Sequence, residues 1–198
     1  MDEETQVAYD RDAALFAADW DAQPAGADLQ ATVLKFFNPG PTADIGCGSG
    51  RDTAWLARNG FAAIGFDYSE GLLTEARRLH PDVEFRRSVL PKLKGIADGS
   101  FTNVLCETVI MHLEPADIPA AVRRLVAILK PGGTLYLTWR VSEGMGTRDK
   151  HGRFYAAFDA ALVSNELKSA QVLLDEQADS ASSGKLVRRI VARKGAAS

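Results

Sequence analysis

Two short segments of the chain contain residues that can bind a nucleoside. Residues 42–50 read Thr-Ala-Asp-Ile-Gly-Cys-Gly-Ser-Gly, an apolar strand that ends in a glycine-rich turn, and Asp67 ends a second apolar strand. Glycine has no side chain, so the backbone of such a turn can approach a ligand closely and take angles denied to other residues. A carboxylate at the end of the neighbouring strand can accept hydrogen bonds from two ribose hydroxyls. Together the two segments predict a site for a ligand that contains a nucleoside.

The spacing of the glycines argues against a dinucleotide. The dinucleotide fingerprint requires a glycine or alanine three positions after its second glycine. Here that position holds Arg51, and the third glycine comes early, at Gly50. An acid, Asp44, also lies two positions before the first glycine. Arg51 therefore disfavours a nicotinamide-dependent dehydrogenase.

The order acid-x-Gly-x-Gly-x-Gly resembles motif I of the class I S-adenosylmethionine-dependent methyltransferases. The resemblance continues almost without interruption to Trp139, through Gly99-Ser-Phe101, Val-Ile-Met-His-Leu at 109–113 and Leu-Lys-Pro-Gly-Gly-Thr-Leu at 129–135. The last of these is frequent in small methyltransferases of the ubiquinone-biosynthesis type. The resemblance implies S-adenosylmethionine as the cofactor and S-adenosylhomocysteine as the product, and it leaves the methyl acceptor open.

The resemblance also implies which residues hold the cofactor. Asp67 would accept hydrogen bonds from the ribose, and Tyr68 would pack on one face of adenine unless it is only an aromatic cover for the core. Ser88 stands where an Asp is common, and a neutral acceptor is weaker than a charged one by about 1 kcal/mol, so we expect a lower cofactor affinity. The residues implied at the cofactor are Asp44, Gly46, Cys47, Gly48, Ser49, Gly50, Asp67, Tyr68, Ser88, Val89 and Glu107.

Glu107 and His112 are the candidate catalytic residues. Methyl transfer mainly requires positioning, and a base is needed only when the acceptor must lose a proton. His112 is the stronger candidate from its side-chain type, because imidazole titrates near neutrality, although it could simply pack on the sheet. Glu107 could orient the cofactor's amino end or the substrate, or be a solvated or arginine-paired acid. Met111 and Thr108 stand where a metal-binding branch of the family has glutamates, so no metal is expected.

The acceptor would lie beyond the ends of the fourth and fifth strands, and two segments could cover it. Residues 140–157 contain a glycine-punctuated, basic stretch that could close over an anionic substrate or could be an exposed loop. Residues 1–38 are expected to form a helical cap that supplies the other wall or only packs on the sheet. The candidate substrate-binding residues are Tyr9, Trp20, Arg140, Arg148, His151, Arg153 and Tyr155.

The elements that must position these residues alternate along the chain. Apolar periodicity and turn signals predict helices over residues 8–20, 26–37, 51–58, 70–79, 117–130 and 158–167. Strands are predicted over residues 42–45, 61–66, 83–87, 101–106, 134–139, 171–175 and 186–192. The alternation predicts a single α/β domain over residues 1–198, Rossmann-like and doubly wound, with helices on both faces of a mostly parallel seven-stranded sheet. The last two strands have no helix between them, so the C-terminal strand should be antiparallel.

Composition limits the partners that we expect. The 198 residues carry a net charge of −3 and only two cysteines, and the acidic start Met-Asp-Glu-Glu-Thr resembles no signal peptide. We therefore expect a cytoplasmic monomer or homodimer with no membrane or nucleic-acid partner. The predicted function is methyl transfer to an oxygen or nitrogen of a small molecule. The alternatives are a macromolecular acceptor, such as tRNA or protein, and a non-catalytic S-adenosylmethionine-binding module.

Overall fold

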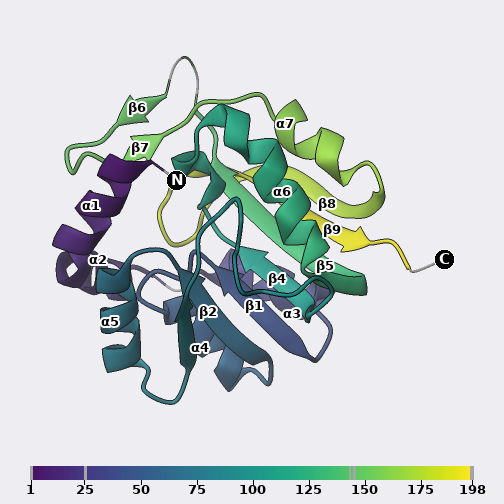
Figure 1. Ribbon diagram of the computed structural model, residues 1–198, viewed down its shortest axis with the longest axis horizontal. Helices are drawn as coiled ribbons and strands as arrows, with labels where there is room; N and C mark the ends of the chain where they lie inside the picture. The colour runs from purple at the N-terminus through teal and green to yellow at the C-terminus, as the bar shows by residue number, and fades with distance from the viewer. Residues whose placement is uncertain (1, 25, 143, 145, 197–198) are drawn as a thin grey trace.

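The computed structural model describes residues 2–24, 26–142, 144 and 146–196. Seven strands form one sheet in the order β3-β2-β1-β4-β5-β9-β8 (Figure 1). Strands β1 to β5 pair in parallel, and β9 is antiparallel to both of its neighbours. This arrangement confirms the predicted fold class. The strands are β1 Pro41–Ile45, β2 Ala62–Asp67, β3 Glu84–Arg87, β4 Phe101–Cys106, β5 Leu129–Arg140, β8 Ala170–Asp179 and β9 Leu186–Lys194.

Helices cover both faces of this sheet. On one face, Leu29 and Val33 of α3 and Leu56 of α4 pack on Leu105 and Tyr136. On the other face, α6 and α7 close over a larger apolar cluster, and Figure 1 shows α6 lying across the front of the sheet. The helices are α1 Glu3–Arg11, α2 Ala13–Asp21, α3 Ala27–Phe36, α4 Arg51–Arg58, α5 Glu70–Leu79, α6 Ile118–Ala127 and α7 Ala161–Ser164. None of the helices in the described part of the chain is both long and apolar enough to span a membrane.

Several predicted elements differ from the structure: the helix expected over residues 158–167 is α7 followed by a 3-10 turn over Asn165–Leu167, and β8 extends to Asp179. Two further differences have identifiable reasons. The single helix expected over residues 8–20 is two helices, because the backbone leaves helical geometry at Asp12. Strand β5 begins at Leu129, inside the segment expected to be the end of a helix and a turn. Leu129 pairs with Phe101, and after a register shift Thr134 pairs with Asn103. The Pro-Gly-Gly segment is therefore an irregularity within the strand, where Gly132 has a φ of +76°.

The segment expected to cover the substrate contains a small hairpin. Strands β6 (Thr147–Arg148) and β7 (Phe154–Tyr155) pair with each other, apart from the main sheet. Figure 1 shows this hairpin beside α1, at the upper left of the molecule. Asp2 accepts hydrogen bonds from the Arg148 guanidinium at 2.8 Å, and the Phe154 amide donates to Thr5 at 2.8 Å. Helices α1 and α2, which we call the N-terminal cap, are thus attached to the hairpin.

A buried arginine ties α3 to the last two strands. Arg189 of β9 is only 4% exposed, and its Nε donates to the Tyr136 hydroxyl at 3.0 Å. Its remaining nitrogens donate to Glu176 at 2.7 Å and to Asp28 in the first turn of α3. Removing Arg189 leaves the fully buried Tyr136 hydroxyl without its partner, whereas Asp28 and Glu176 are partly exposed and can be solvated.

We expect Arg189→Met to lower the free energy of unfolding by about 2 kcal/mol, because the buried Tyr136 hydroxyl loses its partner and two partly exposed acids lose their ion pairs. The neighbouring Arg188 makes a more exposed pair with Asp175, so Arg188→Met should cost less than about 1 kcal/mol. Urea denaturation of both variants measures the difference. Equal losses would contradict the structural role assigned to the buried guanidinium.

Candidate active site

A cavity opens where the parallel strands β1, β2, β4 and β5 end. Of the residues predicted for cofactor, catalysis and substrate, it is lined by Tyr9, Trp20, Asp44, Gly46, Cys47, Gly48, Ser49, Asp67, Tyr68, Ser88, Val89, Glu107, His112 and Arg140. Gly50 is not among the lining residues and instead packs against the Phe85 ring. The carboxyl ends of parallel strands are where ligands bind in doubly wound folds, so the location agrees with the topology.

The turn after β1 brings bare backbone to this cavity. Gly48 has a φ of +56°, and a Cβ placed there would come within 2.7 Å of the Trp20 ring of the N-terminal cap. Gly46 has a φ of +78°, and a Cβ there would lie 2.3 Å from Val109. Both positions therefore require glycine, for their backbone angles and for space.

Asp67 joins this turn to the one after β2. One carboxylate oxygen accepts from the Gly48 amide at 2.9 Å, and the other accepts from the Ser69 amide at 2.9 Å. A carboxylate oxygen has two lone pairs, so each retains capacity for a ligand hydroxyl. Burial raises the pKa of Asp67 above its ordinary value, against the effect of these backbone hydrogen bonds. Asp67 thus shapes the turn in addition to facing the cavity.

Asp44 lies beneath the glycine-rich turn. Thr53 of α4 donates a 2.6 Å hydrogen bond to it, so Asp44 holds the start of α4 against β1. Burial, followed by the neighbouring Asp52, raises the pKa of Asp44 to about 8. A cationic ligand in the cavity would favour its ionised form.

Glu107 is held at the cavity by a short hydrogen-bond chain. The Thr108 amide donates to the Thr138 hydroxyl at 2.9 Å, and that hydroxyl donates to Glu107 at 2.6 Å. Thr108 has a φ of +53°, a rare angle for a β-branched residue and a form of strain that clusters at functional sites. Burial raises the pKa of Glu107 to about 7, although the hydrogen bond from Thr138 opposes the shift. Glu107 can therefore exchange a proton near neutral pH.

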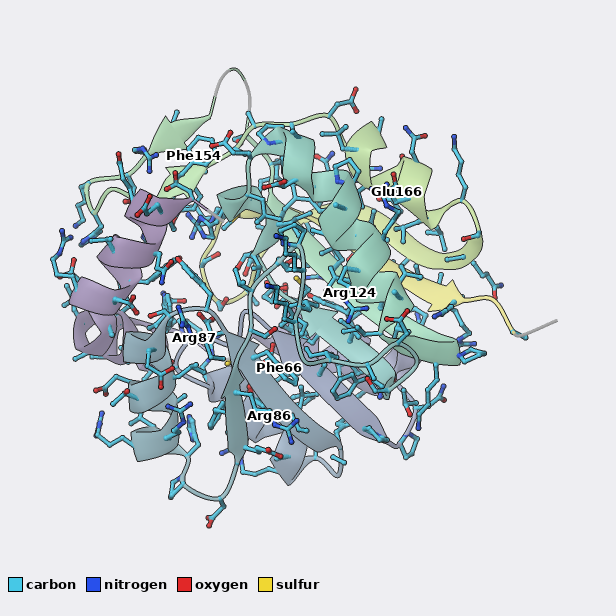
Figure 2. The ribbon with its side chains drawn as sticks, in the orientation of Figure 1. Phe66, Arg86, Arg87, Arg124, Phe154 and Glu166 are labelled. Atoms are coloured by element: carbon cyan, nitrogen blue, oxygen red, sulfur yellow. The ribbon has the colours of Figure 1, made fainter. Side chains whose placement is uncertain are left out.

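His112 connects the N-terminal cap to the hairpin. Its Nδ1 lies 2.5 Å from the Phe154 carbonyl, which can only accept, so Nδ1 carries the proton. Nε2 lies 3.2 Å from the Tyr9 hydroxyl, which donates to it. Burial lowers the pKa of His112 to about 4, so the ring is neutral and both nitrogens have partners. Figure 2 labels Phe154 on the hairpin beside α1.

The basic residues predicted for substrate binding separate into two groups. Arg140 lines the cavity and a second, adjoining one, which Arg148 and Tyr155 also line. Arg153 and His151 line neither cavity. The Arg153 guanidinium pairs with Asp149 at 2.6 Å and lies 4.5 Å from the centre of the Phe16 ring, and the His151 ring lies 5.2 Å from the same ring. These two residues therefore hold the hairpin on the cap.

Several residues that line the cavity were not predicted from the sequence, among them a group of serines and Arg51. The turn between β8 and β9 supplies Ser180, Ser182 and Ser183. Because β9 is antiparallel to β5, its first residue lies beside the end of β5, and this predicted pairing was the signal that could have located the turn. Arg51 also lines the cavity, and it donates to the Trp20 carbonyl at 3.0 Å. Arg51 therefore fastens the N-terminal cap over the glycine-rich turn.

Within the described residues, no three side chains of His, Cys, Asp or Glu gather where a metal ion could be held. Cys47 and Cys106 are both buried free thiols, and burial raises the pKa of each. The absence of a metal remains a prediction.

Comparison with known proteins agrees with this geometry. A sequence profile described as a methyltransferase domain matches residues 43–133, which include the glycine-rich turn, Asp67 and Glu107. The chain belongs to the class I S-adenosylmethionine-dependent methyltransferases. This class I methyltransferase is 37% identical over 100 residues to the ubiquinone biosynthesis O-methyltransferase of Methylococcus capsulatus, covering 48% of the present chain and 41% of that protein. It is 31% identical over 147 residues to the enzyme of the same name from Xanthomonas campestris pv. campestris, and this match covers 67% of the present chain and 60% of that protein.

The chain therefore spans less than two thirds of either relative's length. A solved structure with the same fold is Burkholderia thailandensis 1,6-didemethyltoxoflavin-N1-methyltransferase, with bound 1,6-didemethyltoxoflavin and S-adenosylhomocysteine. Its TM-score is 0.66 at 24% identity, and the match covers 93% of the present chain and 82% of that one.

The cavity of this class I methyltransferase fits the family's cofactor. The Tyr68 hydroxyl is buried and has no hydrogen-bond partner among the described residues. A buried polar group without a partner is costly, and a ligand that contacts it removes that cost. The bare backbone at Gly46 and Gly48 allows a ligand to approach closely, and the spare lone pairs of Asp67 can accept from ribose hydroxyls.

We expect Glu107→Gln to change how stability depends on pH. The folded protein raises the pKa of Glu107 from 4.5 to about 7, so it binds the proton more tightly than the unfolded chain. The wild type should therefore lose stability relative to the variant as the pH rises from 4.5 to 7, and the difference should stay constant above that. We expect a relative change on the order of 2 kcal/mol, since one pKa unit corresponds to about 1.4 kcal/mol.

Urea denaturation of the ligand-free proteins at pH 5 and pH 8 measures this change. Glu114→Gln, which alters an exposed acid, is the matched control and should follow the wild type. The same pH dependence in both variants would show that burial does not raise the pKa of Glu107.

Proposed function

We propose that this chain binds S-adenosylmethionine and transfers its methyl group to an oxygen or nitrogen of a small molecule, releasing S-adenosylhomocysteine. The observation that carries the proposal is the hydrogen bond from the Gly48 amide to Asp67, which sets bare backbone and a carboxylate side by side at two strand ends. The names of the two curated relatives, both ubiquinone biosynthesis O-methyltransferases, support a small-molecule acceptor.

The cofactor would run along the strand ends from β4 to β2. Asp44, Glu107 and the turn from Gly46 to Ser49 would contact the methionine part and ribose, and Asp67 would accept from the ribose hydroxyls. Tyr68, Ser88 and Val89 line the cavity where adenine would lie. Val89 is 39% exposed, so that end of the cavity is open to solvent.

When bound, S-adenosylmethionine would supply a methyl group on a sulfonium sulfur: an acceptor lone pair would bond to the methyl carbon as the S–C bond breaks and its electrons go to sulfur. The protein brings the acceptor into line and excludes water. Glu107 can take the proton that a hydroxyl acceptor must lose, because its pKa is about 7. His112 is better suited to positioning, because its pKa is about 4 and Tyr9 occupies its Nε2.

The experiment that tests this function is transfer of labelled methyl from S-adenosylmethionine to three classes of acceptor: small phenols and amines, unfractionated tRNA, and protein. Label in the small molecules supports the proposal. Label in precipitable tRNA or protein would replace it with a macromolecular substrate. Tight binding of the cofactor with no transfer to any class would indicate a non-catalytic binding module.

We expect Asp67→Ala to weaken S-adenosylhomocysteine binding by about a hundredfold. Two hydrogen bonds to a charged acceptor are together worth about 3 kcal/mol, and each factor of ten corresponds to about 1.4 kcal/mol. Asp82→Ala, which removes an exposed acid after α5, is the control and should bind like the wild type. Calorimetry at constant salt measures both, and unchanged affinity in Asp67→Ala would refute the ribose assignment.

A further inference from the structure

We propose that the methyl acceptor carries an anionic group, a carboxylate or phosphate, and that Arg140 binds this group together with the serine turn Ser180–Ser183. This inference rests on the proposed function and specifies its substrate class. The anion is thus assigned to residues at the end of β5 and the start of β9, and not to the basic residues of the hairpin.

Arg51 pairs with Asp52, Asp149 with Arg153 and Arg148 with Asp2, and the other charges around the two cavities are segregated. The acids Asp44, Asp67 and Glu107 lie at the ends of β1, β2 and β4, where a cationic sulfonium would be held. Arg140 lies at the end of β5, where the first cavity meets the second, and Lys185 lines the second. Opposite charges at the two ends favour a cofactor and an acceptor of opposite sign.

Arg140 is available for a ligand, whereas the nearby arginines are committed. Arg148 pairs with Asp2, Arg153 with Asp149 and Arg51 with Asp52. Across the part of the chain that the structure describes, Arg140 and Lys185 make no ion pair.

The Arg140 guanidinium lies 5.0 Å from the centre of the Tyr155 ring, which restricts its orientation without neutralising it. A planar guanidinium presents paired N–H groups that match an oxyanion.

The serine turn lies directly beside Arg140. The Val141 amide donates to the Leu186 carbonyl at 3.0 Å, which joins the end of β5 to the start of β9. The Ser180 amide donates to the Lys185 carbonyl at 2.9 Å, and the Gly184 amide donates to Ser180 at 2.8 Å, so the turn is closed.

This turn supplies hydroxyl donors. The Ser180 and Ser182 hydroxyls lie 3.2 Å apart, and one of them donates to the other, so one proton of the pair stays available. The Ser183 hydroxyl accepts from the Lys185 amide at 3.4 Å and keeps its own proton. An anion accepts such protons and offers none, so it suits a turn with spare donors.

Aromatic rings lie near Arg140, and this determines our choice of probes. The Tyr155 ring lies beside Arg140, and the Tyr9 ring lies across His112 from it, so flat aromatic acceptors suit the space. We choose 3,4-dihydroxybenzoate and phenyl phosphate as anionic probes and 4-methylcatechol as the neutral probe.

The experiment is calorimetry in two stages on the wild type, Arg140→Gln, the double variant Ser182→Ala/Ser183→Ala, and Arg188→Gln. S-adenosylhomocysteine is titrated first, and then each probe is titrated into the loaded protein. Arg188 pairs with Asp175 and lines neither cavity, so Arg188→Gln controls for the loss of a positive charge.

We expect the wild type to bind at least one anionic probe about tenfold more tightly than the neutral probe. Arg140→Gln should lose this preference while keeping its affinity for S-adenosylhomocysteine, the serine variant should lose part of it, and Arg188→Gln should keep it. Whichever anionic probe binds more tightly shows whether the acceptor's anionic group is a carboxylate or a phosphate.

A wild type that binds S-adenosylhomocysteine but shows no preference for an anion would overturn this inference alone, as would an undiminished preference in Arg140→Gln. A wild type that binds no S-adenosylhomocysteine would instead overturn the proposed function.

Discussion

The Asp67 carboxylate connects the parts of the molecule on which the site depends. It accepts from the Gly48 amide after β1 and from the Ser69 amide at the start of α5. The Ser69 hydroxyl in turn donates to Asp10 of α1 at 2.6 Å, so the same chain of hydrogen bonds reaches the N-terminal cap. A single buried acid therefore links both turns and the cap over them. It is costly to bury, and its backbone hydrogen bonds and a ribose would offset that cost.

The N-terminal cap and the hairpin β6–β7 act as one cover. Tyr9 and Phe154 meet on opposite nitrogens of His112, and Arg148 and Arg153 add ion pairs or ring contacts between the two segments. Most of the basic residues of the hairpin therefore serve to hold the cover together. Arg140, which comes from the sheet itself, is therefore the arginine that we propose for the acceptor, and Glu107 is the group that we propose for proton transfer.

Sequence patterns were sufficient for the sheet, and the residues predicted at the cofactor, except Gly50, line one cavity. Both predictions used local signals. Strand periodicity, the glycine-rich turn and Asp67 each depend on residues close together in the chain. The roles of His112, Arg51 and the serine turn could not be predicted in the same way. The low pKa of His112 arises from burial, and its hydrogen-bond partners Tyr9 and Phe154 come from segments far apart in the sequence. Arg51 was interpreted only as a residue that disfavours a dinucleotide, because its partner, the Trp20 carbonyl, belongs to a separate helix.

The measurement that tests the central claim most directly is calorimetric titration of the wild type with S-adenosylhomocysteine, with NADH as the comparison ligand. We predict one-to-one binding of S-adenosylhomocysteine and no heat from NADH. Arg51 and the glycine-rich turn under the N-terminal cap accommodate a nucleoside but not the pyrophosphate of NADH. Binding of NADH, or of neither ligand, would contradict the account.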